Sequence, residues 1–199
     1  APRGEALMVL SEDPDFQIVG LNWKDDAQDA LAVLRLTGNP YDRIGYDPDN
    51  EPLREALCTL GNGRWASRGS APEAVAGGPH YPGTYAAGVF NRLGVEVSGE
   101  VVENESMVNL PDWQSLTLRV EDGPWLDVDR DTISDYVQEL DLRRGVLTRR
   151  FRVTDEQGRV TAVAQRRLVS MADPFCAGLD TTVVAENYEG VVTVRSGID

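Results

Sequence analysis

His80 is the only histidine in the sequence. A Ser-His-Asp triad, a Cys-His pair or a multi-histidine zinc site would therefore have to use this one residue. Ser67 and Ser70 lie near it in the sequence, but neither stands in the G-x-S-x-G motif of a nucleophile elbow. We expect His80 to hydrogen-bond within its own loop, with a place beside a substrate as the alternative.

Acidic side chains are the other candidates for chemistry, and the sequence has 33 of them. Asp127, Asp129 and Asp131 have the spacing that opens an EF-hand calcium loop, which also needs glycine at its sixth position and glutamate at its twelfth. The sequence has Thr132 and Gln138 there, so we predict a solvated strand edge and no metal site. Glycoside cleavage would use two carboxylates, and the sequence alone singles out no such pair.

Residues 61–66 fit a loose G-x-G-x-x-A pattern. A dinucleotide site needs a strand before this pattern, a helix after it and an acidic residue about 20 residues later. Here a helix is predicted before the pattern, over residues 52–60, with Pro52 in its first turn and Gly61 at its end. We therefore expect these glycines to form a tight turn between two elements.

Alternating apolar and polar residues, separated by turn signals, dominate the rest of the chain. A second helix is possible over residues 26–36, and Pro111 is expected to break the chain between two strands. Such spacing is typical of an all-β antiparallel sandwich. Three strand pairs are predicted: 116–120 with 124–128 around an Asp-Gly turn, 146–153 with 159–169, and 179–185 with 191–195.

The formal net charge of −14 argues against binding to nucleic acid or to anionic membrane surfaces. A hydrophobic content of 41% is ordinary for a globular domain. Cys58 and Cys176 form no ligand or redox motif, which favours a reduced, cytoplasmic setting. No apolar run approaches the roughly 18 residues of a membrane-spanning helix, and no secretory signal opens the chain.

Several long phrases of the sequence occur in the order found in one known family. Together they resemble the N-terminal domain of glycoside hydrolase family 65, which holds the maltose, trehalose and kojibiose phosphorylases and related hydrolases. The resemblance covers residues 45–199, and residues 1–44 match little beyond a first strand. The phrases are Leu57–Gly63, Ser67–Gly69, Tyr81–Arg92, Val108–Trp113, Glu139–Arg149 and Arg166–Asp173.

This resemblance implies a large two-sheet β-sandwich that is incomplete at its C-terminal end. In the family, a helical (α/α)6 barrel follows and carries the general-acid glutamate and the phosphate-binding residues, so no catalytic residue is expected here. The parent enzyme would split an α-linked glucosyl disaccharide with inversion, using phosphate as cosubstrate, no metal and no organic cofactor. We expect packing against the barrel and a homodimer. Missing strands would leave an unpaired sheet edge or exposed apolar surface.

Six side chains within the family-like phrases, or next to them, are candidates for a role beyond packing. Arginine and asparagine fix loops through several hydrogen bonds, or hold sugar hydroxyls against an aromatic ring. We expect these residues to support a loop or a domain interface, with the border of the substrate site as the alternative. They are Arg68, His80, Tyr81, Tyr85, Asn91 and Arg92.

Two other functions stay open from the sequence. In a hydrolase of the same architecture, water would replace phosphate, and that choice depends on barrel residues. A free-standing carbohydrate-binding sandwich would need exposed aromatic side chains on one face, for which Trp113, Trp125 and Tyr136 are the candidates.

Overall fold

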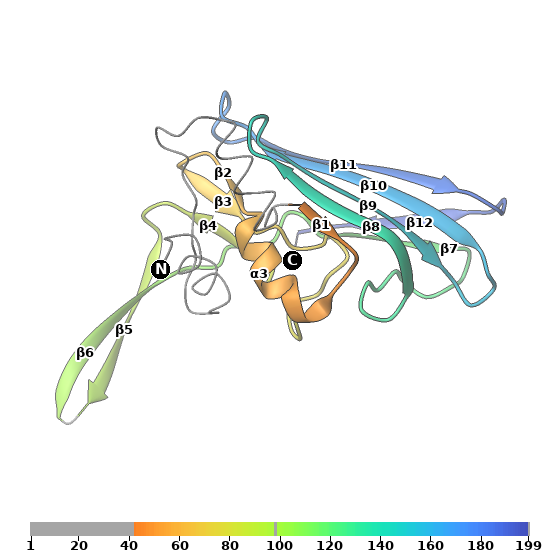
Figure 1. Cartoon of the computed structure of the whole chain (residues 1–199). Coiled ribbons are helices and arrows are strands. Elements are labelled where there is room, and N and C mark those ends of the chain that lie inside the picture. Colours follow the sequence, from red (N-terminus) through yellow and green to blue (C-terminus); the bar gives the residue numbers. More distant parts are fainter. Residues whose placement is uncertain (1–41, 98, 199) are drawn as a thin grey trace, which may run out of the picture.

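The computed structural model describes residues 42–97 and 99–198. Its largest unit is a five-stranded sheet, in which all neighbouring strands are antiparallel (Figure 1). In spatial order the strands are β1 (Asp42–Ile44), β8 (Thr132–Asp141), β9 (Val146–Thr154), β10 (Val160–Val169) and β11 (Ala177–Ala185).

The β9–β10 hairpin shows why this sequence forms a sheet. Its turn is closed by Asp155, whose carboxylate accepts hydrogen bonds from the backbone of Gln157 and Arg159 at 2.9 Å each. Gly158 takes the positive φ of 75° that the turn requires. Along both strands buried and more exposed residues alternate, so one face of the hairpin is committed to the interior. The predicted pairing of 146–153 with 159–169 is confirmed.

A second, two-stranded sheet pairs β7 (Leu116–Val120) with β12 (Val192–Ser196). It packs on the inner face of the five-stranded sheet, and a buried apolar cluster between them contains side chains from both sheets. Within the described residues that arrangement is a β-sandwich with one short α-helix, in agreement with the all-β sandwich of little helix that the sequence predicts. The cluster consists of Leu118, Leu126, Tyr136, Phe151, Val153 and Val163.

The remaining elements cover one end of the sandwich. The 3₁₀ helix η1 (Pro48–Asn50) leads into α3 (Glu51–Leu57), and the short strands β2 (Leu60–Gly61), β3 (Trp65–Ser67) and β4 (Thr84–Ala86) form a three-stranded sheet. A second buried cluster joins these elements to the large sheet. It contains Cys58, Leu60, Leu140, Leu147 and Val169.

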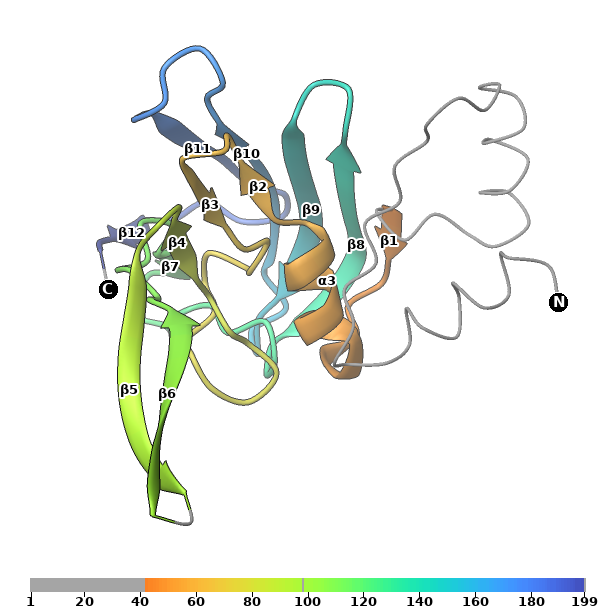
Figure 2. The ribbon, with the colours of Figure 1, turned by 90° about the vertical axis from the view of Figure 1, so that its left-hand side faces the viewer.

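A long hairpin of β5 (Phe90–Val97) and β6 (Glu100–Met107) projects from the rest of the molecule. Figures 1 and 2 show it standing clear of both sheets of the sandwich in two perpendicular views. All of its residues whose side chains are described are exposed. This hairpin was not among the predicted strand pairs.

Two of the three predicted strand pairs are wrong in their partners. Residues 124–128 form no strand, and β7 pairs instead with β12. The predicted pair 179–185 with 191–195 is also wrong, since β11 pairs with β10 and lies in a different sheet from β12. The connection between β11 and β12 crosses from one sheet to the other, so these two strands cannot share a ladder.

The helix predicted over residues 52–60 is confirmed as α3, although it ends at Leu57 and Gly61 belongs to β2. Pro111 separates β6 from β7, as predicted. The helix predicted over residues 26–36 lies outside the described residues. The predicted boundary at residue 45 and the predicted incompleteness of the sandwich stay predictions. In the described part of the chain, no helix is long and apolar enough to cross a membrane.

Candidate functional site

Four of the six candidate side chains meet around one buried carboxylate, that of Glu55 in α3. We call this group the Glu55 cluster. Glu55 has no exposed surface, and α3 places it on the face turned toward the loop between β3 and β4. The cluster contains Tyr46, Glu55, Arg68, His80, Tyr81, Tyr85 and Asp129.

Both oxygens of Glu55 are used to hold the loop. Oε1 lies 3.0 Å from Nδ1 of His80, and Oε2 accepts a hydrogen bond of 2.9 Å from the backbone nitrogen of Tyr81. The guanidinium of Arg68 lies 3.6 Å from Oε2. Because a buried carboxylate is costly without partners, these three contacts tie α3 to the loop.

The other side of His80 faces a second acidic group. Its Nε2 lies 3.2 Å from the hydroxyl of Tyr46 and 3.3 Å from a carboxylate oxygen of Asp129. The hydroxyl of Tyr46 donates to the other oxygen of Asp129. When His80 is protonated, both of its ring nitrogens can donate, one to Glu55 and one to the Tyr46–Asp129 pair.

The surroundings favour the charged form of His80. Burial by itself lowers the pKa of His80, but the hydrogen bond to Glu55 and the charges of Asp129, Glu55 and Glu51 outweigh it and raise the pKa above its ordinary value of 6.5. Burial and the hydrogen bond to Asp129 raise the pKa of Tyr46, so that hydroxyl stays protonated. The protonated form of His80 is therefore stabilised between two acidic side chains.

This arrangement predicts a pH dependence that a single variant can isolate. A group whose pKa is raised on folding stabilises the native state below its unfolded pKa of about 6.5, and that stabilisation is lost as the pH rises through the folded pKa. The free energy of unfolding of the wild type should fall over that interval. In His80→Gln it should stay level there. Urea titrations of both proteins over a pH series measure the difference.

The same prediction has a direct spectroscopic test. Because His80 is the only histidine, the imidazole signals in an NMR titration belong to one residue, and their midpoint gives its pKa. A midpoint at or below 6.5 would contradict this stabilisation of the protonated form.

Arg68, Tyr81 and Tyr85 pack at the outer side of the cluster. The guanidinium of Arg68 donates to the carbonyl of Pro52 at 3.1 Å and lies 5.5 Å from the ring centre of Tyr81. Burial raises the pKa of Tyr85, and its neighbour Tyr81 adds to the shift. The ring of Tyr85 lies so close to Gly83 that a Cβ there would stand 2.7 Å from the tyrosine hydroxyl. A larger residue at position 83 would therefore displace the ring of Tyr85.

Asn91 and Arg92 do not join the cluster. They lie on β5 of the projecting hairpin, where Arg92 faces Glu103 and Glu105 of β6 at 3.6 and 3.7 Å. These three side chains are each at least half exposed, so solvent screens their ion pairs. The six candidates thus divide between the Glu55 cluster and an exposed hairpin.

Sequence reasoning did not anticipate a second group of polar side chains inside the protein. Glu73, from the loop after β3, accepts from Arg149 of β9 at 2.6 Å and from Gln165 of β10 at 2.7 Å, while Arg149 also donates to Gln165 at 2.9 Å. All three are buried. We call them the Glu73 triad. Arg149 is two residues after Leu147 on β9, so both side chains point to the interior. This alternation along the strand was the one signal in the sequence for the burial of Arg149.

A further buried arginine lies beside this triad. Burial and the nearby charge of Arg149 lower the pKa of Arg167 to about 10, while the charge of Glu73 acts in the opposite direction. Glu73 is therefore a counter-charge for both arginines.

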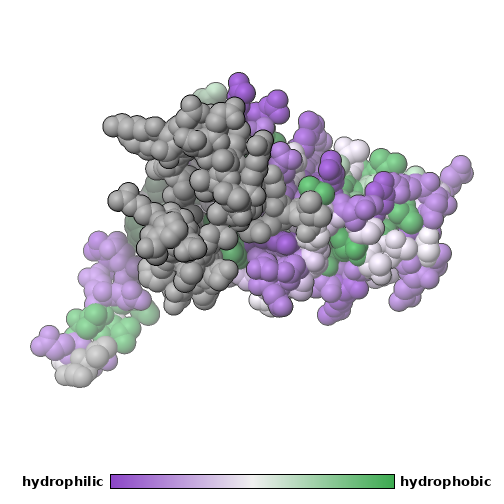
Figure 3. Space-filling view, viewed as in Figure 1, coloured by the Kyte–Doolittle hydropathy of each residue, from purple (hydrophilic) through white to green (hydrophobic). Residues whose placement is uncertain are grey.

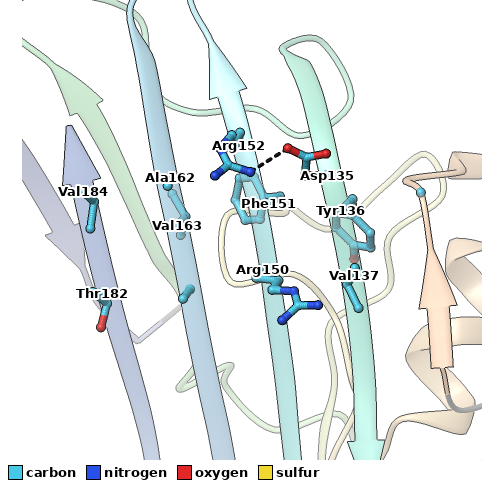
Figure 4. A pocket seen from close by; sticks show the side chains of 12 residues that line it. Asp135, Tyr136, Val137, Arg150, Phe151, Arg152, Ala162, Val163, Thr182 and Val184 are labelled. Carbon is cyan, nitrogen blue, oxygen red and sulfur yellow. Dashed lines mark hydrogen bonds and ion pairs between the residues drawn. The ribbon is translucent and has the colours of Figure 1, made fainter. Parts of the chain in front are cut away.

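A hollow with a volume of about 660 Å³ lies over the five-stranded sheet. Figure 4 shows Arg150 and Arg152 of β9 along it, and Thr182 and Val184 of β11 on the other side of β10. Arg152 is already paired there with Asp135 and Glu186. The hollow includes no member of the Glu55 cluster.

The three aromatic residues that a carbohydrate-binding face would need differ in exposure. Tyr136 is only 2% exposed. Trp113 donates to Ser67 at 3.1 Å. The ring of Trp125 has the guanidinium groups of Arg119 and Arg195 at 5.0 and 4.5 Å from its centre. Tyr136 is therefore not available to stack against a sugar, and the carbohydrate-binding alternative rests on Trp113 and Trp125.

Both side-chain oxygens of Glu55 and both ring nitrogens of His80 have partners, and neither residue lines the hollow over the five-stranded sheet. Within residues 42–97 and 99–198, no group of three or more metal-ligating side chains is found.

Comparison with known proteins decides the family. The model of the glycosyl hydrolase family 65 N-terminal domain matches residues 43–199. The chain belongs to glycosyl hydrolase family 65. Its match is to the N-terminal domain, in agreement with the resemblance in the sequence.

Individual relatives of this family 65 chain are much longer than it is. An uncharacterized glycosyl hydrolase of Mycobacterium tuberculosis is 50% identical over 155 residues, which are 78% of this chain and 12% of that protein. A kojibiose phosphorylase of Caldanaerobacter subterraneus is 34% identical over 145 residues, covering 73% of this chain and 18% of the enzyme. The chain therefore spans less than a fifth of either relative's length.

A solved structure shares the fold. The structure titled as a putative kojibiose phosphorylase from human microbiome superposes with a TM-score of 0.65 at 24% identity, covering 73% of this chain and 20% of that one. At this identity the likeness concerns the fold of the family 65 domain.

Proposed function

We propose that this chain is the non-catalytic N-terminal domain of an enzyme that cleaves α-glucosyl disaccharides by inverting phosphorolysis. The observation that carries the proposal is the family match over residues 43–199, together with a relative named kojibiose phosphorylase. Phosphate would be the cosubstrate, and the domain would require no metal or organic cofactor. The cytoplasmic setting, which rests on the two cysteines, stays a prediction.

Within the parent enzyme, we assign the domain to packing against the catalytic barrel and to forming a homodimer. The Glu55 cluster supports this assignment because its buried members stiffen a loop whose outer residue, Tyr81, is 55% exposed. Such a ring, with Arg68 beneath it, suits the border of a domain interface or a substrate site. Asn91 and Arg92 of the exposed hairpin are proposed for the same kind of border, and His80 would act by holding the loop.

The function is tested with the chain alone and with a version extended through the catalytic region. Both are incubated with phosphate and kojibiose, trehalose or maltose, and β-glucose 1-phosphate and free glucose are measured. We expect glucose 1-phosphate from the extended protein and no product from the chain alone. Turnover by the short chain would contradict the assignment, and glucose without glucose 1-phosphate would identify a hydrolase instead.

A further inference from the structure

The β5–β6 hairpin is a two-stranded ribbon whose two outer edges are unpaired in the described part of the chain. Figure 3 shows apolar and polar residues side by side on its surface, and Leu93 and Val101 are 60% and 77% exposed. An isolated two-stranded hairpin is marginally stable in water, and an open edge is a template for another strand. The hairpin therefore presents a surface for a partner.

The loop length fixes which backbone groups of β5 point outward. Two residues separate Val97 from Glu100, which are partners in the register. In a hairpin of this length the closing pair exchanges both N–H···O=C bonds, and the direction of these groups alternates along the strand. The N–H and C=O groups of Arg92, Gly94 and Glu96 are therefore directed away from β6.

The residues of β5 with outward backbone groups are complementary in charge to the same residues of a second copy. We propose that β5 pairs antiparallel with β5 of a second copy of this chain, with Gly94 opposite Gly94 at the two-fold axis. This register places Arg92 of each copy opposite Glu96 of the other. Opposite charges in directly facing positions stabilise a sheet, and Glu96 has no ion-pair partner within the described part of its own chain.

A second register of β5 on β5 aligns the same number of residues and is less favourable. It would place Leu93 opposite Leu93, with Arg92 facing Gly94 and Glu96 facing Phe90, so neither charge would face an opposite charge on β5 of the second copy. In the Gly94-centred register, Leu93 also faces Val95 of the second copy. On the face that carries these two residues, the β6 partners of Val95, Leu93 and Asn91 are uncharged, namely Val102, Asn104 and Ser106.

Strand β6 does not offer the same possibility. The alternation that turns the backbone of Gly94 outward does the same for Glu103 and Glu105 on β6. If β6 paired antiparallel with β6 of a second copy, residues with outward backbone groups would have to face each other. Of the registers that satisfy this condition, the two that align the most residues place Glu103 opposite Glu103 or opposite Glu105 of the second copy. Like charges directly opposite each other are destabilising. In a chain with a net charge of −14, β5 is thus the edge at which two copies can meet.

This inference deepens the proposed function, since it gives the proposed homodimer a surface. Sedimentation equilibrium of the chain tests it with Arg92→Glu and Glu96→Arg. Each variant alone should bind itself about a hundredfold more weakly than the wild type, because it brings like charges together at both pairs. An equimolar mixture of the two should dimerise again, because the two glutamates of one variant then face the two arginines of the other at these positions.

Matched charge changes away from the hairpin serve as controls. Arg143→Glu and Glu156→Arg lie on turns of the five-stranded sheet and should leave the dimer unchanged. In the wild type, hydrogen exchange at the amides of Arg92, Gly94 and Glu96 should slow as protein concentration rises, which tests the edge without any substitution.

A wild type that stays monomeric, a dimer insensitive to both substitutions, or a mixture that fails to associate would overturn the proposal. None of these readouts involves sugar or phosphate, so failure of the β5 pairing is distinguishable from failure of the proposed phosphorolysis.

Discussion

Glu55→Ala is expected to lower the free energy of unfolding by about 3–5 kcal/mol, the usual cost of removing one partner from a buried ion pair. The substitution leaves the protonated imidazole of His80 and the backbone nitrogen of Tyr81 without the acceptors they have in the wild type. It also removes an acidic group near Arg68. Urea unfolding followed by tryptophan fluorescence measures the loss.

Glu55→Gln separates charge from shape at this position. The amide oxygen can still accept one hydrogen bond, so we expect a smaller loss than for alanine. Glu156→Ala, on an exposed turn, is the control and should change stability by less than about 0.5 kcal/mol. Equal stability of Glu55→Ala and Glu156→Ala would show that the cluster does not hold the loop.

Glu73→Ala should be comparably damaging, by about 3–5 kcal/mol. Arg149 would keep its charge in the interior without the carboxylate that lies 2.6 Å away. Arg167 would lose the same compensating charge. Arg149→Met should also destabilise the protein, since Glu73 would then remain buried with Gln165 as its remaining donor in the Glu73 triad.

The double variant Glu73→Leu/Arg149→Met sharpens this test. Replacing both members of a buried ion pair by apolar side chains of similar size is often nearly neutral. We therefore expect the double variant to be more stable than Arg149→Met alone, with a coupling energy visible in a double-mutant cycle made with Glu73→Leu. Additive losses would mean that the ion pair contributes nothing specific to the fold.

The sequence predicted the strands better than their partners. Residues 116–120 and 191–195 were both expected as strands, but the Asp-Gly turn suggested a local hairpin where the structure pairs β7 with β12. Gly123 does close a turn onto Val120 at 3.0 Å. Beyond it, Pro124 has no N–H to donate to a ladder. A local turn signal therefore carried no information about which distant strand would complete the sheet.

The candidate site shows the same division between local and distant information. Arg68, His80, Tyr81 and Tyr85 could be selected because they lie within 18 residues of one another in a glycine- and aromatic-rich segment. Tyr46 and Asp129 complete the surroundings of His80. Tyr46 lies before α3 in the sequence, and Asp129 lies in the loop before β8. Spacing along the chain cannot reveal such contacts, because they depend on how the sheets pack.

The two edges of the projecting hairpin also bear on how large an assembly can grow. Sheet extension normally has no natural end, because each added strand exposes a fresh edge. Here the strand that would lie outermost after pairing is β6, whose Glu103 and Glu105 repel another copy of themselves. A two-fold contact of this kind closes on itself, so association would stop at two chains and would not continue into a fibre.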